Sequence, residues 1–335
     1  MVSNIGNVEL EHGTSPDDDG VLIMMGTDEH VESGGLTYDF YEETCPEVEN
    51  IVRAGVQPVF STDIASPAAF LRLMFHDCQV QGCDASILVD PGNENGLSEM
   101  ASTKNFGIRK RKTINLLKSM VEAACPNQVS CADIIILAAR EAVAASGGPR
   151  IKVPLGRRDS SLTPSYELAN DLLPPSTIGV TETLQIFANK GMSTEESVAI
   201  MGSHTLGITH CLNIINRLYE PQDGQINVMA PGFEVFLRLR CPEFSLASNS
   251  SFVFNDPTTL EFDNMYYRNA MRGHGLLRID AEMVMDPRTT QVVRRFGADQ
   301  DAFFRAFSSA FVKLSSYGAL VGNKGVVRKR CDALE

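Results

Sequence analysis

The chain has 335 residues, of which 43% are hydrophobic, and its formal net charge is −13. This length allows one large domain or two ordinary ones, and the acidic balance argues against a nucleic-acid partner, because phosphate binding needs clustered Lys and Arg. The basic run Arg109–Lys112 is short, and we interpret it as the solvated start of a helix. No apolar run approaches the ~20 residues of a membrane span, so no membrane partner is expected.

The first 34 residues differ in composition from the rest of the chain. They are acidic and rich in Gly and Ser, with three consecutive aspartates at 17–19. They lack the basic segment and apolar core of a signal peptide. We therefore predict that residues 1–34 are a disordered extension or pro-segment. Residues 35–335 are expected to form one domain, because no repeat or linker divides them.

Helix signals dominate this domain. Thr44 and Glu47 have the spacing of a capping box and predict a helix that runs towards Phe60. Ser66 and Pro67 supply an N-cap and a proline at the first position of the next helix. Further capped or apolar segments predict helices at Ser130–Ala145, at Ser193–Met201, at Glu261–Met271 and at Asp301–Leu314.

Strand signals are few and short. Residues 91–107 and 219–260 are rich in Gly, Pro, Asn and Ser, and they are expected to be long loops. The sequence therefore predicts a mostly α-helical fold.

The second predicted helix carries two polar residues that suit acid–base chemistry. Arg72 and His76 are four residues apart and share a helical face. A neighbouring cation lowers the pKa of a histidine and favours its neutral form, which can accept a proton. The guanidinium can stabilise a developing anion. The alternative is that Arg72 pairs with a carboxylate and that His76 is a structural core residue.

The loop that follows presents hard oxygen donors at Asp77, Asp84 and Ser86, and Val80 and Gly82 could add backbone carbonyls. Such donors suit Ca²⁺. The alternative is a charged surface turn.

A second histidine, His204, lies at the end of the helix capped by Ser193, and it is followed by Thr205. Such a histidine is usually structural, unless a metal or cofactor faces it. Asp256, Thr259 and Asp263 offer a second set of oxygen donors, which Thr205 could join.

The eight cysteines are spread over the whole domain, and none forms a CxxC pair, so a zinc site is not expected. Four disulfides in a secreted protein is the preferred interpretation. Eight buried thiols in a cytosolic protein is the alternative. The sequon at Asn249 agrees with secretion, although such triplets also occur by chance.

Several motifs together resemble the plant secretory haem peroxidases, the class III group, from Leu36 to Cys331. They are Arg72-Leu-Met-Phe-His-Asp-Cys78, Gln81-Gly-Cys-Asp-Ala-Ser86, Val129-Ser-Cys-Ala-Asp133, Pro154-Leu-Gly-Arg-Arg-Asp159, Gly202-Ser-His-Thr205 and Phe262-Asp-Asn264. The resemblance implies the haem peroxidase fold, in which haem b lies between a distal and a proximal group of helices.

The resemblance also implies a role for individual residues. His204 would be the axial ligand of the haem iron, and Asp280 would accept the other N–H of its ring. His76 would be the acid–base catalyst, with Arg72 stabilising charge and Asn105 orienting the imidazole. Phe75 would line the distal pocket, and Pro174 would position aromatic donors at its entrance.

Two Ca²⁺ ions are implied as well. Asp77, Val80, Gly82, Asp84 and Ser86 would hold the first ion, with support from Glu99 through water. Thr205, Asp256, Thr259 and Asp263 would hold the second, together with a backbone carbonyl near Glu261. The family's disulfide pairing would be Cys45–Cys125, Cys78–Cys83, Cys131–Cys331 and Cys211–Cys241.

The chain departs from the family pattern at a few positions. Gln79 and Leu206 stand where Phe is usual, and Asn255 corresponds to the position at which intracellular peroxidases have a Trp. The stretch from Thr259 to Asp263 is one residue short. None of these departures affects Arg72, His76 or His204.

The resulting expectation is a secreted, monomeric peroxidase that reduces hydrogen peroxide and oxidises small phenolic donors, in wall phenolic polymerisation or in oxidative stress. The short tail after Cys331 favours the cell-wall space over the vacuole. The alternatives are a calcium- or wall-binding module on the same fold, a scaffold without haem, and an enzyme of this class that mainly generates reactive oxygen species.

Overall fold

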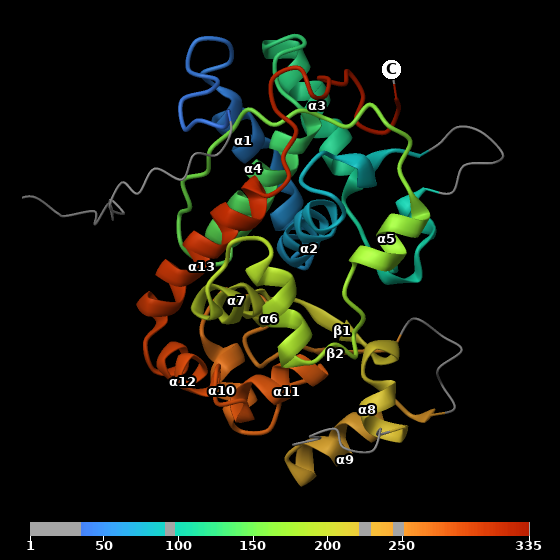
Figure 1. Ribbon diagram of the computed structural model, residues 1–335, viewed down its shortest axis with the longest axis vertical. Helices are drawn as coiled ribbons and strands as arrows, with labels where there is room; N and C mark the ends of the chain where they lie inside the picture. The colour runs from blue at the N-terminus through green and yellow to red at the C-terminus, as the bar shows by residue number, and fades with distance from the viewer. Residues whose placement is uncertain (1–34, 91–97, 221–228, 244–250, 335) are drawn as a thin grey trace, which may run out of the picture. The chain divides into compact units, whose positions relative to one another are not determined.

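A computed structural model describes residues 35–90, 98–220, 229–243 and 251–334. The predicted N-terminal extension and Asn249 lie outside these residues. The described residues belong to one compact unit, Ser33–Glu335, which is mostly helical (Figure 1).

The helices and strands follow one another along the chain in this order. They are α1 (Val48–Thr62), α2 (Ser66–Gln79), α3 (Arg111–Ala124), α4 (Cys131–Ala145), α5 (Tyr166–Leu172), α6 (Val180–Ala188), α7 (Thr194–Met201), β1 (Ile208–His210), α8 (Ile215–Tyr219), α9 (Pro231–Arg240), β2 (Phe252–Phe254), α10 (Met265–Met271), α11 (Arg278–Met285), α12 (Thr290–Ala298) and α13 (Gln300–Ser316). Short 3₁₀ turns include η1 (Ser86–Leu88), η2 (Glu99–Ala101), η3 (Thr103–Asn105), η4 (Gly202–Thr205) and η5 (Cys211–Asn213).

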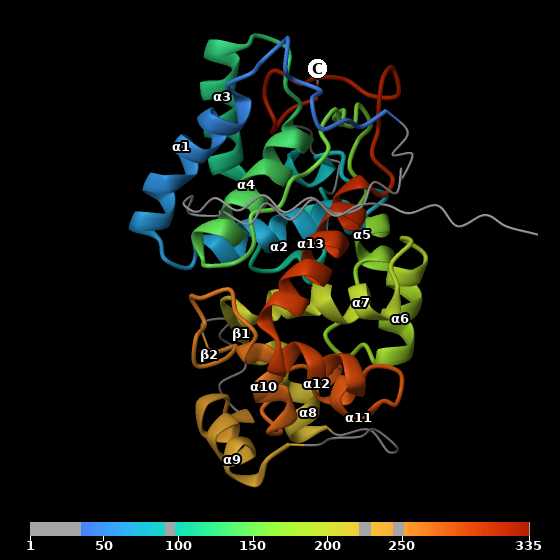
Figure 2. The same ribbon diagram turned by 90° about the vertical axis from the view of Figure 1, so that its left-hand side faces the viewer.

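The helices form two groups, which Figures 1 and 2 show one above the other. In the first, α4 packs against α1, α2 and α3. Its residues 131–143 are all buried, as expected of a helix that is apolar on nearly every side. In the second, α6, α7 and α10–α12 pack on one another, and α13 contacts α7, α12 and α2. Helix α13 therefore joins the two groups.

Buried polar contacts fix the start of α4. Ser130 accepts a hydrogen bond from the backbone N–H of Asp133, so the predicted N-cap is confirmed. Asp159 accepts from the N–H groups of Cys131 and Ala132, and a carboxylate at a helix N-terminus is favourable. The carboxylate of Asp133 binds Arg157 at 2.8 Å. The family motifs around residues 130 and 157 are thus joined in space.

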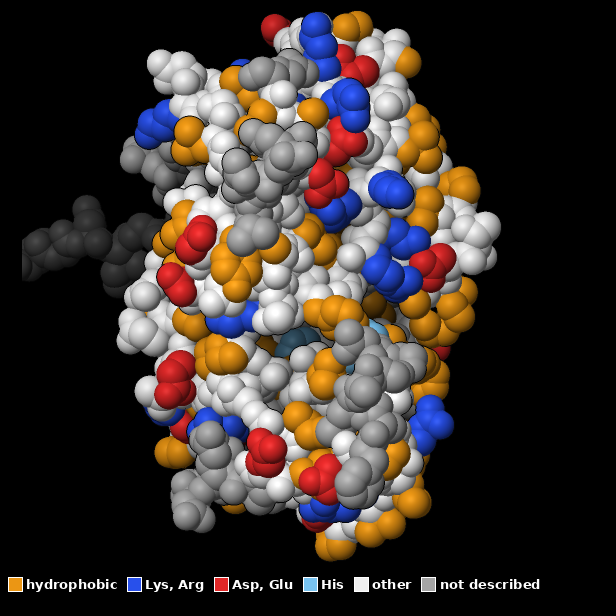
Figure 3. All heavy atoms as spheres, turned by 90° about the vertical axis from the view of Figure 1, so that its right-hand side faces the viewer, with side chains coloured by type: hydrophobic (Ala, Val, Ile, Leu, Met, Phe, Trp, Pro, Cys, Tyr) orange, Lys and Arg blue, Asp and Glu red, His pale blue; other side chains and the backbone are white. Residues whose placement is uncertain are grey.

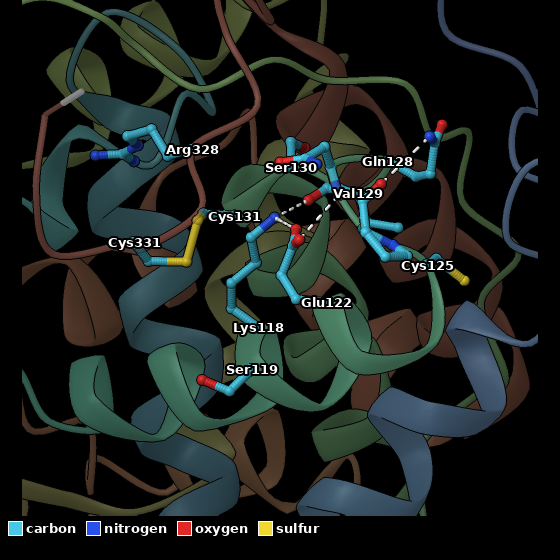
Figure 4. Close-up of polar contacts among 12 residues, drawn as sticks. Lys118, Ser119, Glu122, Cys125, Gln128, Val129, Ser130, Cys131, Arg328 and Cys331 are labelled. Carbon is cyan, nitrogen blue, oxygen red and sulfur yellow. Dashed lines mark hydrogen bonds and ion pairs between the residues drawn. A yellow bond between two sulfur atoms is a disulfide. The ribbon is translucent and has the colours of Figure 1, made fainter.

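A buried lysine holds the turn between α3 and α4 (Figure 4). The ammonium of Lys118 lies 2.5 Å from Glu122 and 2.6 Å from the carbonyl of Val129. Glu122 also accepts from the N–H of Asn127. A buried ammonium is costly unless it is hydrogen-bonded. The contacts of Lys118 with Glu122 and Val129 therefore hold the end of α3 against the residues that precede α4.

All four predicted disulfides are confirmed: Cys45–Cys125, Cys78–Cys83, Cys131–Cys331 and Cys211–Cys241. The described residues contain no free cysteine. The last pair joins η5 to the end of α9, beside the short antiparallel pairing of β1 with β2.

Some predicted helix starts are wrong. Helix α1 begins at Val48 and its N-cap Glu47 makes no side-chain cap, because Thr44–Glu47 form a turn in which the N–H of Val48 bonds to Cys45. Ser66 is the first residue of α2 and its hydroxyl donates to the carbonyl of Asp63, so it is not the N-cap. Helix α10 begins four residues later than predicted, at Met265.

Other boundaries hold. The capping box of Ser193 and Glu196 is confirmed at α7, and α4 and α13 lie close to their predicted ranges. Residues 219–260 are not all loop, because α9 and β2 lie within them.

No helix in the described ranges combines the length and the apolar character needed to span a bilayer.

Candidate active site

Arg72 and His76 lie together on α2, as the spacing predicted. The Nε of Arg72 is 3.2 Å from the Nε2 of His76, and the guanidinium also donates to the carbonyl of Lys104. Burial, and then the charge of Arg72, lower the pKa of His76 to about 3. Burial lowers the pKa of Arg72 to about 10, so the guanidinium remains charged at neutral pH. The pair therefore combines a neutral imidazole with a fixed cation.

Asn105 fixes the tautomer of His76. Its Oδ1 lies 2.7 Å from the Nδ1 of His76, and its Nδ2 donates to the carbonyl of Glu99 at 2.8 Å. Because the amide oxygen can only accept, Nδ1 carries the ring proton. The lone pair is then on Nε2, where it accepts a hydrogen bond from the Nε–H of Arg72. A substrate that displaces this contact can deliver its proton to the same nitrogen.

The second histidine is held by a carboxylate. The Nδ1 of His204, in η4, lies 3.0 Å from the Oδ1 of Asp280, in α11. The same oxygen accepts from the hydroxyl of Tyr266 at 2.7 Å, and Oδ2 accepts from the N–H of Leu277. Burial raises the pKa of Asp280, but the contacts with His204 and these hydrogen bonds outweigh it and hold the pKa below its ordinary value.

Tyr266 was not identified from the sequence. Its ring meets the ring of His204 edge to face, with centroids 5.9 Å apart. The only signal was its position shortly after the Phe262–Asn264 motif, which gives no hint that its hydroxyl reaches Asp280.

Three buried carboxylates lie around the loop that follows α2. They belong to Asp77, Asp84 and Glu99. Burial raises the pKa of Asp77, and the charges of Asp84 and Glu99 raise it further; burial also raises the pKa of Glu99 to about 7. One oxygen of Asp77 and one of Glu99 have no hydrogen-bond partner among the described residues. Repelling, incompletely bonded carboxylates are what a bound cation would stabilise.

The backbone of this loop is tightly constrained. Gln81, Gly82 and Ala85 have positive φ, and a Cβ on Gly82 would lie 2.3 Å from the carbonyl oxygen of Gly318. Glycine is therefore required at position 82. In the described part of the chain, no three His, Cys, Asp or Glu side chains converge as a metal site by themselves. A cation at this loop would thus need the carbonyls and the Ser86 hydroxyl as well.

The second oxygen cluster lies beside His204. The hydroxyl of Thr205 contacts Asp256 at 2.7 Å and Asp263 at 3.2 Å. Burial, with a contribution from Asp263, raises the pKa of Asp256 to about 6.

The structure places Thr258, rather than Thr259, between these carboxylates. The Thr258 hydroxyl lies 3.2 Å from both Asp256 and Asp263, whereas the Thr259 hydroxyl donates to the carbonyl of Gly207.

Pro174 lines an open groove. A cavity of about 350 Å³ is bounded by Leu172–Pro175, by the segment before α6, and by Arg278 of α11. On the side of the molecule where α5 lies, Figure 3 shows a hollow at mid-height with histidine atoms recessed in it. Phe75, on α2, meets His76 edge to face and contacts Phe187 of α6.

Comparison with known proteins identifies the family of the chain. A family model described as peroxidase matches residues 52–299. The chain belongs to the peroxidase family. It is 55% identical over 315 residues to Peroxidase 29 of Arabidopsis thaliana, covering 93% of each chain.

Two further relatives come from the same plant. Peroxidase 12 is 40% identical over 302 residues (89% of this chain, 82% of the relative), and Peroxidase 28 is 39% identical over 317 residues (93% and 97%). The predicted class III membership and mostly helical fold are therefore confirmed, and the chain is a plant peroxidase enzyme.

The departures from the family pattern have structural roles in this peroxidase. Leu206 is buried in the main core. The amide of Asn255 donates to the carbonyl of Leu206 and accepts from the hydroxyl of Thr209, so it supports the segment that follows His204. Gln79 is buried and donates to the carbonyl of Leu172, at the end of α5.

Proposed function

We propose that this peroxidase binds haem b through His204, reduces hydrogen peroxide at His76 and Arg72, and oxidises small phenolic donors by one-electron steps. The observation that carries the proposal is the buried imidazole of His76, which Asn105 holds in one tautomer beside a permanent cation. A lone structural histidine needs neither contact.

The residues around His204 fit a haem group. Asp280 occupies Nδ1, so Nε2 is left for the iron. The side chain of His204 is 33% exposed although that of Asp280 is only 4% exposed, which leaves the ring accessible to a bound group. When bound, haem supplies the oxidising power.

The protein residues move one proton and stabilise one charge. Nε2 of His76 would take a proton from one oxygen of hydrogen peroxide, while Nδ1–H stays bonded to Asn105. The same nitrogen would return that proton to the other oxygen, which leaves as water, and the haem group would supply the two electrons that cleavage of the O–O bond requires. Arg72 stabilises the negative charge that develops as the O–O bond breaks.

Two Ca²⁺ ions are part of the proposal. The first would be held by Asp77, Asp84 and Ser86 with the carbonyls of Val80 and Gly82, and supported by Glu99. It would lie next to the catalytic helix, and the backbone carbonyl of Glu99 accepts a hydrogen bond from the Nδ2 of Asn105.

The second ion would be held by Thr205, Asp256 and Asp263. Thr258 would take the place predicted for Thr259, because its hydroxyl is the one directed at both carboxylates.

The proposed cellular location and electron donors rest on the disulfides and on the groove at Pro174. Four disulfides in one domain favour an oxidising compartment, so we propose secretion to the cell-wall space and a monomeric enzyme. The open groove at Pro174 favours small aromatic donors such as wall phenolics. The binding-module alternative is not favoured, because the family and its close relatives are peroxidases.

The test is reconstitution with haem and Ca²⁺, followed by a panel of phenolic donors under steady-state peroxide, with and without residues 1–34. We expect a Soret band that shifts on adding peroxide, and donor oxidation. A colourless protein after reconstitution, or no oxidation of any phenolic donor, would contradict the proposal.

A further inference from the structure

Helix α5 ends in a way that leaves its last carbonyls without partners from the chain that follows. The last carbonyls of any helix lack intrahelical donors, and the next backbone N–H groups usually cap them. Here Leu173 is followed by Pro174 and Pro175, which have no N–H. The N–H of Leu173 donates to the carbonyl of Ala169. Donors for the remaining carbonyls must therefore come from elsewhere in the fold.

Lys104 and Gln79 supply donors to three carbonyls of this segment. The ammonium of Lys104 lies 2.5 Å from the carbonyl of Asn170 and 2.6 Å from that of Leu173. The amide of Gln79 donates to the carbonyl of Leu172 at 3.0 Å. A cation at a helix C-terminus is also electrostatically favourable.

Both residues belong to segments that carry the catalytic groups. Gln79 is the last residue of α2, the helix of Arg72 and His76. Lys104 precedes Asn105, and its own carbonyl accepts from Arg72. An apolar cluster of Val80, Ala169 and Leu173 completes the contact between the end of α2 and α5.

The segment held in this way is one wall of the donor groove. The cavity is lined by Leu172, Leu173, Pro174 and Pro175, and also by Arg278. A shift of that wall changes the groove while leaving the His76–Asn105 contact in place, because the latter depends on Glu99.

We propose that Lys104 and Gln79 are positioning residues for the electron donor: they hold Leu172–Pro175 against the catalytic segments and so set the affinity for phenolic donors, with no part in the peroxide step. This inference rests on the proposed function. It also explains the polar residue at position 79, since an aromatic side chain there could not bond to the Leu172 carbonyl.

The test uses the haem- and calcium-loaded full chain. Lys104→Met and Gln79→Met remove the donors and keep side-chain length. Lys104→Arg restores a cation. Lys112→Met is the matched control, since Lys112 is an exposed lysine in α3. The measurements are the rate constant with peroxide by stopped flow, the KM for guaiacol, and hydrogen exchange of peptides covering residues 166–178.

Lys104→Met should raise the KM for guaiacol about 5- to 10-fold and Gln79→Met about 2- to 5-fold, as expected for the loss of charged and neutral hydrogen bonds. Exchange in residues 166–178 should quicken in both, the peroxide rate constant should stay within about twofold, and Lys104→Arg should recover most of the KM. Lys112→Met should behave as wild type.

Unchanged hydrogen exchange of residues 166–178 in both Met variants would show that Lys104 and Gln79 do not hold this segment in place. Faster exchange with an unchanged KM would overturn the donor role. A peroxide rate constant that falls in parallel with donor oxidation would show that these residues act through His76 instead. If the wild type oxidises no donor, the proposed function fails on its own. Exchange and the calorimetric Kd of guaiacol would still decide the inference.

Discussion

Removing the proposed calcium ion should destabilise the protein more at alkaline than at acidic pH. Without the cation, Asp77, Asp84 and Glu99 remain buried close to one another. Burial raises the pKa of Glu99 from 4.5 to about 7. At 1.4 kcal/mol per pH unit, keeping this one carboxylate ionised in the folded state costs about 3 kcal/mol.

The sign follows from proton binding. The folded, calcium-free protein binds the Glu99 proton more tightly than the unfolded chain does. Its stability therefore falls as pH rises from about 4.5, and the full cost is present above about 7. The raised pKa values of Asp77 and Asp84 act in the same direction.

The assay is thermal unfolding of calcium-saturated and calcium-depleted protein at pH 5.5 and pH 8, with calcium content checked by atomic emission. Glu99 is already largely ionised in the unfolded chain at pH 5.5, so about 2 kcal/mol of the cost appears between pH 5.5 and pH 8. At about 2–4 °C per kcal/mol, the scale for domains of about 150–250 residues, Glu99 alone should widen the difference in Tm at pH 8 by about 4–8 °C. The side chain of Glu99→Gln cannot ionise, so the depleted variant should lose the share of the pH dependence that Glu99 contributes, while the share of Asp77 and Asp84 remains.

A difference in Tm that is equal at the two pH values, or larger at pH 5.5, would refute the reasoning. So would a depleted Glu99→Gln variant with the same pH dependence as depleted wild type.

Three further predictions concern the catalytic groups. The peroxide rate constant should be flat from pH 8 to about 5 and fall at lower pH with an apparent pKa near 3, because His76 must be neutral; a midpoint near 6.5 in pH-jump stopped flow would contradict this. Asn105→Val should lower the same rate constant by about 10-fold or more, since His76 loses its fixed tautomer; an unchanged rate would exclude that role. Tyr266→Phe should make the midpoint potential of the haem iron more negative, because Asp280 loses a hydrogen-bond donor and then polarises His204 more strongly. Tyr267→Phe is the control, since the Tyr267 hydroxyl donates to the carbonyl of Val198 and the potential should not change. Equal midpoint potentials in the two variants would argue against the role of the Tyr266 contact.

The sequence predicted most reliably what depends on local spacing. Arg72 and His76 share a face because four residues make about one helical turn, and the structure places them in contact. The Ser193 capping box formed for the same reason. The disulfide pairing could not come from spacing, and it was available only through the resemblance to a family.

What the sequence missed depends on contacts between distant segments. The hydroxyl of Tyr266 reaches Asp280 only because α10 packs on α11. The ammonium of Lys104 contacts the carbonyl of Asn170, which lies 66 positions along the chain. Hydrophobic periodicity in the sequence cannot predict a contact of this kind. The contact of the Thr258 hydroxyl with both Asp256 and Asp263 likewise depends on how the loop folds, which local spacing does not specify.

The central claim is that His76 is the acid–base group of the peroxide reaction. The most direct measurement is stopped-flow mixing of haem-loaded His76→Ala with hydrogen peroxide, after the Soret band has shown that haem is bound. We predict that the rate constant for the peroxide-dependent spectral change falls by about 10²-fold or more. A rate constant like that of the wild type, with haem equally bound, would contradict the account.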